Sequence, residues 1–121
     1  MSTVLVLGGP DGGGTVKVLR NAGVEVLEAE RAVDGLELAR DRRPDLLIVA
    51  GGIAGIEGDE FTLAMRSDPV IRETPVVFCG PRQVERELWL LSSICGVSRV
   101  LIEPYAPDEL LRLIGGLLSP R

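Results

Sequence analysis

The sequence has no histidine and few aromatic residues, which make up 3% of its 121 residues. Without histidine, the chain lacks the usual zinc ligand, a histidine-based catalytic pair and a phosphohistidine relay. With one tryptophan and one tyrosine, it also lacks a stacking platform for single-stranded nucleic acid. A net charge of −5 disfavours binding to the negatively charged phosphate backbone of a nucleic acid. We therefore expect neither a metal site nor a nucleic-acid partner.

Long apolar runs are absent as well, since no segment approaches the roughly 20 residues of a membrane-spanning helix. Residues 1–9 lack the basic flank of a signal peptide, so we expect a cytoplasmic protein that does not insert into membranes. In that reducing compartment, Cys79 and Cys95 are expected to act as small apolar side chains. The length predicts one domain, residues 1–118, with residues 119–121 as a tail or the start of a linker.

Short apolar runs alternate with segments of helical length along the chain. The runs predicted as strands are residues 3–7, 24–29, 45–50, 75–79 and 99–102, of which 24–29 alternates and is expected to be less buried. The segments predicted as helices are residues 15–22, 32–42, 59–67, 83–94 and 107–118. Continuous apolar strands between amphipathic helices require a parallel sheet covered on both faces. The sequence therefore predicts a doubly wound, three-layer α/β fold.

Glycine and proline support these boundaries. Gly23 follows the first predicted helix and is typical of a helix stop. Pro44 disfavours helix at the residue before it, ahead of the third predicted strand. Pro107 fits the first turn of the last predicted helix.

Three segments resemble the receiver domain of bacterial response regulators. Residues 22–49, AGVEVLEAERAVDGLELARDRRPDLLIV, are similar to that family's second strand, second helix and third strand. Residues 44–58, PDLLIVAGGIAGIEG, are similar to its third strand and following loop, and residues 102–111, IEPYAPDELL, to its Lys-Pro-Phe-x-Pro-Glu-Glu-Leu ending. The resemblance covers nearly the whole chain. It implies a five-stranded parallel sheet in the order 2-1-3-4-5 and a cis peptide bond before Pro104.

The resemblance also implies that this chain has lost the family's phosphorylation site. That site needs two acidic residues, an acceptor aspartate, a serine or threonine, and a lysine; the matching positions here are Gly8, Gly9, Ala50, Gly80 and Glu103. The family's carboxylates hold Mg²⁺ and its lysine stabilises the phosphoryl group. Glycine and alanine do neither, and Glu103 would repel a phosphate. Val100 likewise replaces the aromatic residue that moves when the family switches state.

Two functional hypotheses follow. The first is a phosphorylation-independent pseudo-receiver that acts by protein–protein interaction in bacterial signal transduction, with no enzyme activity and no cofactor. A plainer version of it is an inert domain retained as a folding unit. The second is a flavodoxin-like module that binds a small anionic ligand or nucleotide at the glycine-rich loop, residues 8–14, because backbone N–H groups before a helix can bind phosphate. The spacing of this loop fits neither standard phosphate-binding motif, which favours a plain flexible loop.

The predicted helix 83–94 carries more apolar residues than one buried face needs. Val84, Leu88, Leu91 and Cys95 recur at helical spacing and are predicted to face the sheet. Trp89, Leu90 and Ile94 lie off that stripe and are candidates for binding a protein partner or a second copy. In the family, the face formed by the fourth helix, fifth strand and fifth helix commonly makes such contacts. The alternative is that Trp89 packs against its own domain.

Overall fold

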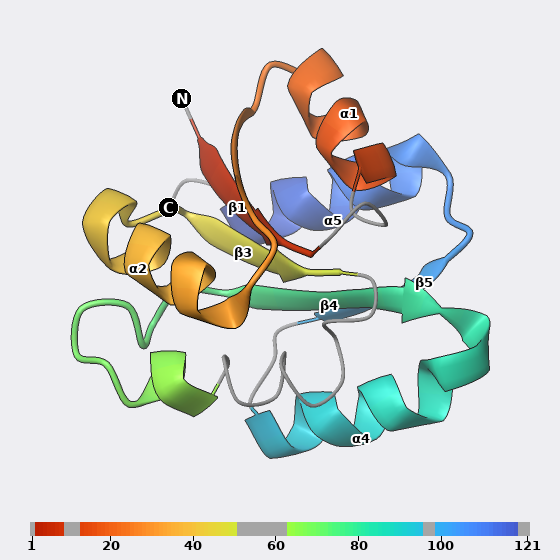
Figure 1. The fold of residues 1–121 in the computed structure, drawn as a ribbon. Coiled ribbons are helices and arrows are strands. Elements are labelled where there is room, and N and C mark those ends of the chain that lie inside the picture. Colours follow the sequence, from red (N-terminus) through yellow and green to blue (C-terminus); the bar gives the residue numbers. More distant parts are fainter. Residues whose placement is uncertain (1, 9–12, 51–62, 96–98, 119–121) are drawn as a thin grey trace.

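The computed structural model describes residues 2–8, 13–50, 63–95 and 99–118, in which five strands are joined by helices (Figure 1). The strands are β1 (Thr3–Leu7), β2 (Glu25–Ala29), β3 (Leu46–Val49), β4 (Val76–Pro81) and β5 (Arg99–Glu103). The helices are α1 (Gly13–Asn21), α2 (Ala32–Arg42), α4 (Glu85–Cys95) and α5 (Pro107–Leu118). A 3₁₀ turn, η3 (Arg82–Val84), directly precedes α4, and residues 63–66 are also helical.

All five strands are parallel and lie in the order β2-β1-β3-β4-β5. Helices α1 and α5 cover one face of this sheet, and α2 and α4 cover the other (Figure 1). The predicted three-layer α/β fold and its strand order are therefore confirmed.

Strand β3 lies at the centre of the sheet, and this position explains its uninterrupted apolar run. Leu46 and Ile48 pack in the core beneath α1 and α5, whereas Leu47 and Val49 pack in the core beneath α2 and α4. All four side chains are fully buried. Because successive side chains of a strand point to opposite faces, a strand covered on both faces has no position for a polar residue.

The edge strand β2 differs from β3 in the way that its sequence predicts. Val26 and Ala29 are buried, whereas Glu25 and Glu28 are exposed. Glu28 accepts a 3.0 Å hydrogen bond from Arg20 of α1, and charged side chains on an edge strand disfavour pairing with a further strand.

The predicted helix boundaries are largely correct. Helix α1 ends at Asn21, and Gly23 has a φ of +84°, a conformation that glycine adopts without steric cost. Helix α2 ends at Arg42, and Arg43 adopts a left-handed conformation, with its N–H bonded to the carbonyl of Ala39 at 2.9 Å.

Three predicted boundaries were wrong by two residues, and several others by one residue. Helix α1 begins at Gly13 instead of residue 15, so the last two glycines of the predicted loop belong to the helix. Strand β4 continues to Pro81, past the predicted end at Cys79. The predicted helix 83–94 begins as the separate turn η3, and α4 starts only at Glu85. Of the helix predicted at 59–67, residues 59–62 lie outside the described part of the chain.

The start of α4 also corrects the predicted buried stripe. Leu88 is fully buried, as predicted, but Val84 is 37% exposed. Val84 belongs to the 3₁₀ turn, so the four-residue spacing that aligns side chains within one α-helix does not relate it to Leu88. The side chains of Leu91 and Cys95 lie outside the description.

Candidate functional site at the carboxyl ends of the strands

Four of the five positions predicted for a lost phosphorylation site lie at one edge of the sheet. Gly8 follows β1, Ala50 follows β3, Gly80 is near the end of β4, and Glu103 ends β5. These strands are neighbours and run parallel, so their carboxyl ends share one edge, where open α/β sheets bind ligands. The fifth position, Gly9, lies outside the described residues, as do residues 10–12 of the glycine-rich loop.

The backbone of Ala50 leaves no room for a side chain at Gly8. A Cβ atom added to Gly8 would lie 2.8 Å from the carbonyl oxygen of Ala50. The backbone holds this approach, because the N–H of Gly8 bonds to the carbonyl of Ala29 at 2.9 Å and the N–H of Ala50 to that of Leu7 at 2.8 Å. Ala50 is fully buried. The two chain segments are therefore packed directly against each other.

The space beside Gly80 is filled by an apolar side chain. A Cβ at this position would lie 2.9 Å from the Cδ1 atom of Leu88, which is fully buried. A serine or threonine at Gly80 would therefore require the end of the Leu88 side chain to shift.

Glu103 is the charged residue among these four positions, and its side chain is half-buried. The thiol of Cys79, on the neighbouring strand β4, donates a hydrogen bond to Oε2 of Glu103 at 3.4 Å. The Glu103–Pro104 peptide bond is cis, in agreement with the resemblance. The carboxylate is thus held against the sheet by a group from the adjacent strand.

Burial and the contact with Glu103 make Cys79 a poor nucleophile. Burial, and then the negative charge and hydrogen bond of Glu103, raise the pKa of the Cys79 thiol from 9.0 to about 12. Because the thiolate is the reactive form, very little of Cys79 is reactive at pH 8.

We expect iodoacetamide at pH 8 to leave Cys79 unmodified in the folded protein and to alkylate it fully in denaturant, because burial and Glu103 keep the thiol protonated. Peptide mapping by mass spectrometry measures both states. Alkylation of folded Cys79 at the rate of a free thiol would contradict the protonated, buried thiol.

Sequence reasoning missed a pair of hydroxyl groups next to this edge. The hydroxyls of Thr15, in α1, and Tyr105, after β5, share a hydrogen bond. Thr15 is 2% exposed, and burial raises the pKa of Tyr105 more than its bond to Thr15 lowers it. These residues line a hollow of about 330 Å³ together with Glu103, and the bond joins the start of α1 to the loop before α5.

Val100, predicted to replace the family's moving aromatic residue, lies in β5. Its half-buried side chain packs against the core cluster that contains Phe78 and Leu88. It has no hydroxyl group and no ring.

The outer side of α4 carries the predicted partner-binding residues. Trp89 is 53% exposed and Leu90 is 63% exposed, so both lie off the buried stripe. The side chain of the third candidate, Ile94, lies outside the description. Trp89 and Leu90 help line a hollow of about 780 Å³, whose other lining residues come from η3 and the first turn of α4: Arg82, Gln83, Glu85, Arg86 and Glu87.

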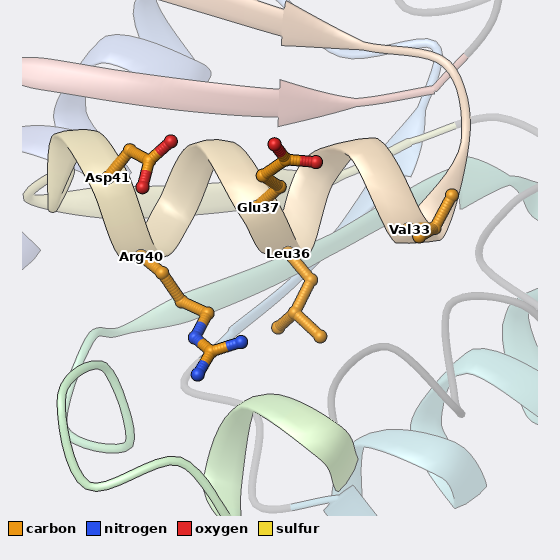
Figure 2. Close-up of a pocket in the computed structure, with 5 residues that line it drawn as sticks. All are labelled: Val33, Leu36, Glu37, Arg40 and Asp41. Atoms are coloured by element: carbon orange, nitrogen blue, oxygen red, sulfur yellow. The ribbon is translucent and has the colours of Figure 1, made fainter.

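Figure 2 shows a further hollow, of about 480 Å³, along α2. Leu36 and Arg40 extend from the helix on one side, and Glu37 and Asp41 lie along it. Arg40 forms a 2.8 Å ion pair with Asp68. This hollow contains none of the predicted site residues, and its charged groups do not converge on one point.

Among the described residues, no three histidine, cysteine or acidic side chains come close enough together to hold a metal ion. None of the described helices is both long enough and apolar enough to cross a membrane.

No protein-family model matches the chain. Two curated proteins of Pseudomonas aeruginosa are similar to it in sequence. Protein PilH is 27% identical over 103 residues, which cover 84% of each chain. The phosphate regulon transcriptional regulatory protein PhoB is 25% identical over 100 residues, which cover 83% of this chain and 43% of PhoB.

Solved structures agree in fold over almost the whole length. The chemotaxis protein CheY4 of Vibrio cholerae superposes with a TM-score of 0.84 at 25% identity, covering 98% of this chain and 99% of that one. The receiver domain of a sensor histidine kinase from Pseudomonas aeruginosa, which has a magnesium ion in its active-site cleft, gives a TM-score of 0.83 at 20% identity over 98% of each chain. The chain therefore has the fold of a response-regulator receiver domain.

Proposed function

We propose that this chain is a pseudo-receiver: a signalling module with the receiver fold that acts by protein–protein contact, without phosphorylation and without enzyme activity. The observation that carries this proposal is the contact between Gly8 and Ala50. A carboxylate at Gly8 would have to occupy space that the backbone of Ala50 already fills, and Ala50 itself is fully buried.

The chemistry of phosphoryl transfer supports the same proposal. Mg²⁺ requires oxygen ligands, chiefly carboxylates, and it neutralises the phosphoryl oxygens during transfer. Gly8 and Ala50 provide no carboxylate, and Gly80 provides no hydroxyl. Glu103 places a negative charge where the receiver family has a lysine, and it would repel the phosphoryl group.

The proposed contact surface is the face that α4, β5 and α5 form, centred on Trp89 and Leu90. Tryptophan is among the residues most enriched at the energetic centres of protein interfaces. Here its ring is about half exposed, next to a leucine that is exposed further. Two large neighbouring apolar side chains on one helix favour a binding surface over scattered surface residues.

We expect acetyl phosphate with Mg²⁺ to leave the mass of the intact protein unchanged, because acceptor, metal ligands and lysine are all replaced. The receiver domain of the Pseudomonas aeruginosa sensor histidine kinase, which holds a magnesium ion in its active-site cleft, serves as the comparison protein in the same assay. Ala50→Asp should also remain unmodified, because one carboxylate beside Glu103 makes a poor metal site. Phosphorylation of the wild-type chain that depends on Mg²⁺ would overturn the proposal.

A further inference from the structure

The hollow beside the end of β5 lies between α1 and the loop that leads to α5, two helices that cover the same face of the sheet (Figure 1). Its volume of about 330 Å³ is at the lower end of the range for ligand pockets and suits one group the size of a side chain. The lining combines a carboxylate, two hydroxyl groups and an apolar wall: Glu103, Thr15, Tyr105, Val18, Pro104 and Pro107.

Glu103 brings a full negative charge to this hollow without a cation to match it. Within the described part of the chain, the ion pairs are made by other carboxylates: Glu25, Glu28, Asp68 and Glu73. The hydrogen bond that Glu103 accepts comes from the Cys79 thiol at 3.4 Å, and a thiol is a weak donor. A half-buried carboxylate of this kind gains most from a charged donor that a ligand supplies.

The charges around the hollow favour a cation over an anion. Asp108 and Glu109 follow Pro107 in the first turn of α5 and add two negative charges to that of Glu103. The positive ends of α1 and α5 contribute only about half a charge each. Lys17 and Arg20 of α1 line a different hollow. An anionic ligand would therefore be repelled, and a cationic one attracted.

The arrangement of acceptors favours a guanidinium group. The bond between Thr15 and Tyr105 uses one hydroxyl proton and leaves lone pairs for a further donor. A guanidinium has five N–H donors in a planar fork, which can pair with both oxygens of a carboxylate, and it stacks on aromatic rings. It is also more weakly hydrated than an ammonium group. We propose that this hollow binds the guanidinium group of a ligand, with Glu103 as the charged acceptor.

Two sources can present that group: a free small molecule, or an arginine side chain of another protein. Val18, Pro104 and Pro107 provide apolar surface for the attached carbon chain in either case. The inference goes beyond the proposed function, because it assigns a ligand to the edge of the sheet and does not depend on the surface around Trp89.

NMR titration of isotope-labelled protein with butylguanidine tests the proposal. We expect the amide signals of Thr15, Glu103 and Tyr105 to shift, with a dissociation constant of about 1 mM. Butylurea has the same shape without the charge, and it should bind at least about tenfold more weakly. Butylamine has the charge without the planar fork and should bind more weakly than butylguanidine. Inorganic phosphate should leave these three signals in place.

Glu103→Gln removes the charge and keeps the size of the side chain, so it should weaken butylguanidine binding at least about tenfold. Glu37→Gln is the matched control, because it makes the same change of charge at an exposed residue of α2, on the opposite face of the sheet (Figure 1). It should change the affinity by less than about twofold, since α2 contributes nothing to this hollow.

A peptide, acetyl-Ala-Arg-Ala-amide, distinguishes the two sources. Tighter binding of the peptide than of butylguanidine would identify an arginine of a protein as the ligand, and the reverse order would identify a free small molecule. Both orders support the proposed chemistry, provided that Glu103→Gln weakens the binding of both probes.

Three results would overturn the inference. The first is an absence of shifts with both guanidinium probes up to about 10 mM. The second is binding of butylurea or phosphate as tight as that of butylguanidine. The third is unchanged affinity in folded Glu103→Gln. The first two use the wild-type chain alone, so they decide the matter even if the variant unfolds. None of them bears on phosphorylation, which the acetyl phosphate experiment tests separately.

Discussion

Gly8→Ala is expected to lower the free energy of unfolding by about 2 kcal/mol, as forced overpacking does in a well-packed interior. The added Cβ would lie 2.8 Å from the carbonyl oxygen of Ala50, and backbone atoms cannot turn aside as a flexible side chain can. Hydrogen bonds from Gly8 to Ala29 and from Ala50 to Leu7 hold both segments in place. The strain must therefore spread into the central strands β1 and β3.

Gly14→Ala is the matched control. A Cβ at Gly14 would meet no atom within 4 Å, and Gly14 lies in α1, so alanine should stabilise the protein by about 0.5 kcal/mol. Urea unfolding followed by circular dichroism measures both variants. Equal effects of the two substitutions would show that the approach of Gly8 to Ala50 is not a packing constraint.

The same contact bears on any attempt to restore the phosphorylation site. Gly8→Asp combined with Ala50→Asp would add two carboxylates where one backbone approach and one fully buried methyl group now lie. We expect the double variant to be less stable than the wild type and not to bind a metal ion.

Leu88→Ala is expected to cost about 3 kcal/mol of stability, within the range found for large-to-small changes in protein cores. Leu88 is fully buried, packs in the core beneath α2 and α4, and lies over Gly80 of β4. Removing it leaves a cavity at the contact that holds α4 on the sheet.

Leu90→Ala supplies the comparison, because it removes the same atoms from the same helix at a side chain that is 63% exposed. Its effect on stability should stay within about 0.5 kcal/mol. Thermal and urea unfolding of the pair test the assignment of the two faces. If Leu90→Ala destabilised the fold as much as Leu88→Ala, the exposed side of α4 would be part of the core.

Features with a short period along the chain could be predicted from sequence. The boundaries of α2 and α5 were predicted to the residue, because an amphipathic repeat and a nearby proline, Pro44 after α2 and Pro107 at the start of α5, act within a few residues. The exposure of Trp89 and Leu90 followed from the same repeat, since each residue turns about 100° around the helix from the last. The predicted burial of Val84 was wrong, because Val84 lies in a 3₁₀ turn, whose period differs from that of an α-helix.

The candidate site could be predicted only in part. Chain order placed Gly8, Ala50, Gly80 and Glu103 at strand ends, and parallel strands then brought them to one edge. How closely Gly8 approaches Ala50 depends on the register of β1 against β3 and on the hydrogen bonds at their ends. No local pattern contains that information.

The α/β fold class followed from local patterns, because apolar runs buried on both faces, helical repeats and turn residues each act locally and all agree. Which polar groups meet depends on tertiary packing. Cys79 reaches Glu103 because β4 and β5 pair in a particular register, and Thr15 reaches Tyr105 across 90 residues because α1 and the loop before α5 lie on the same face. Such contacts depend on the packing of whole elements against one another, and a side chain's neighbours in sequence do not reveal them.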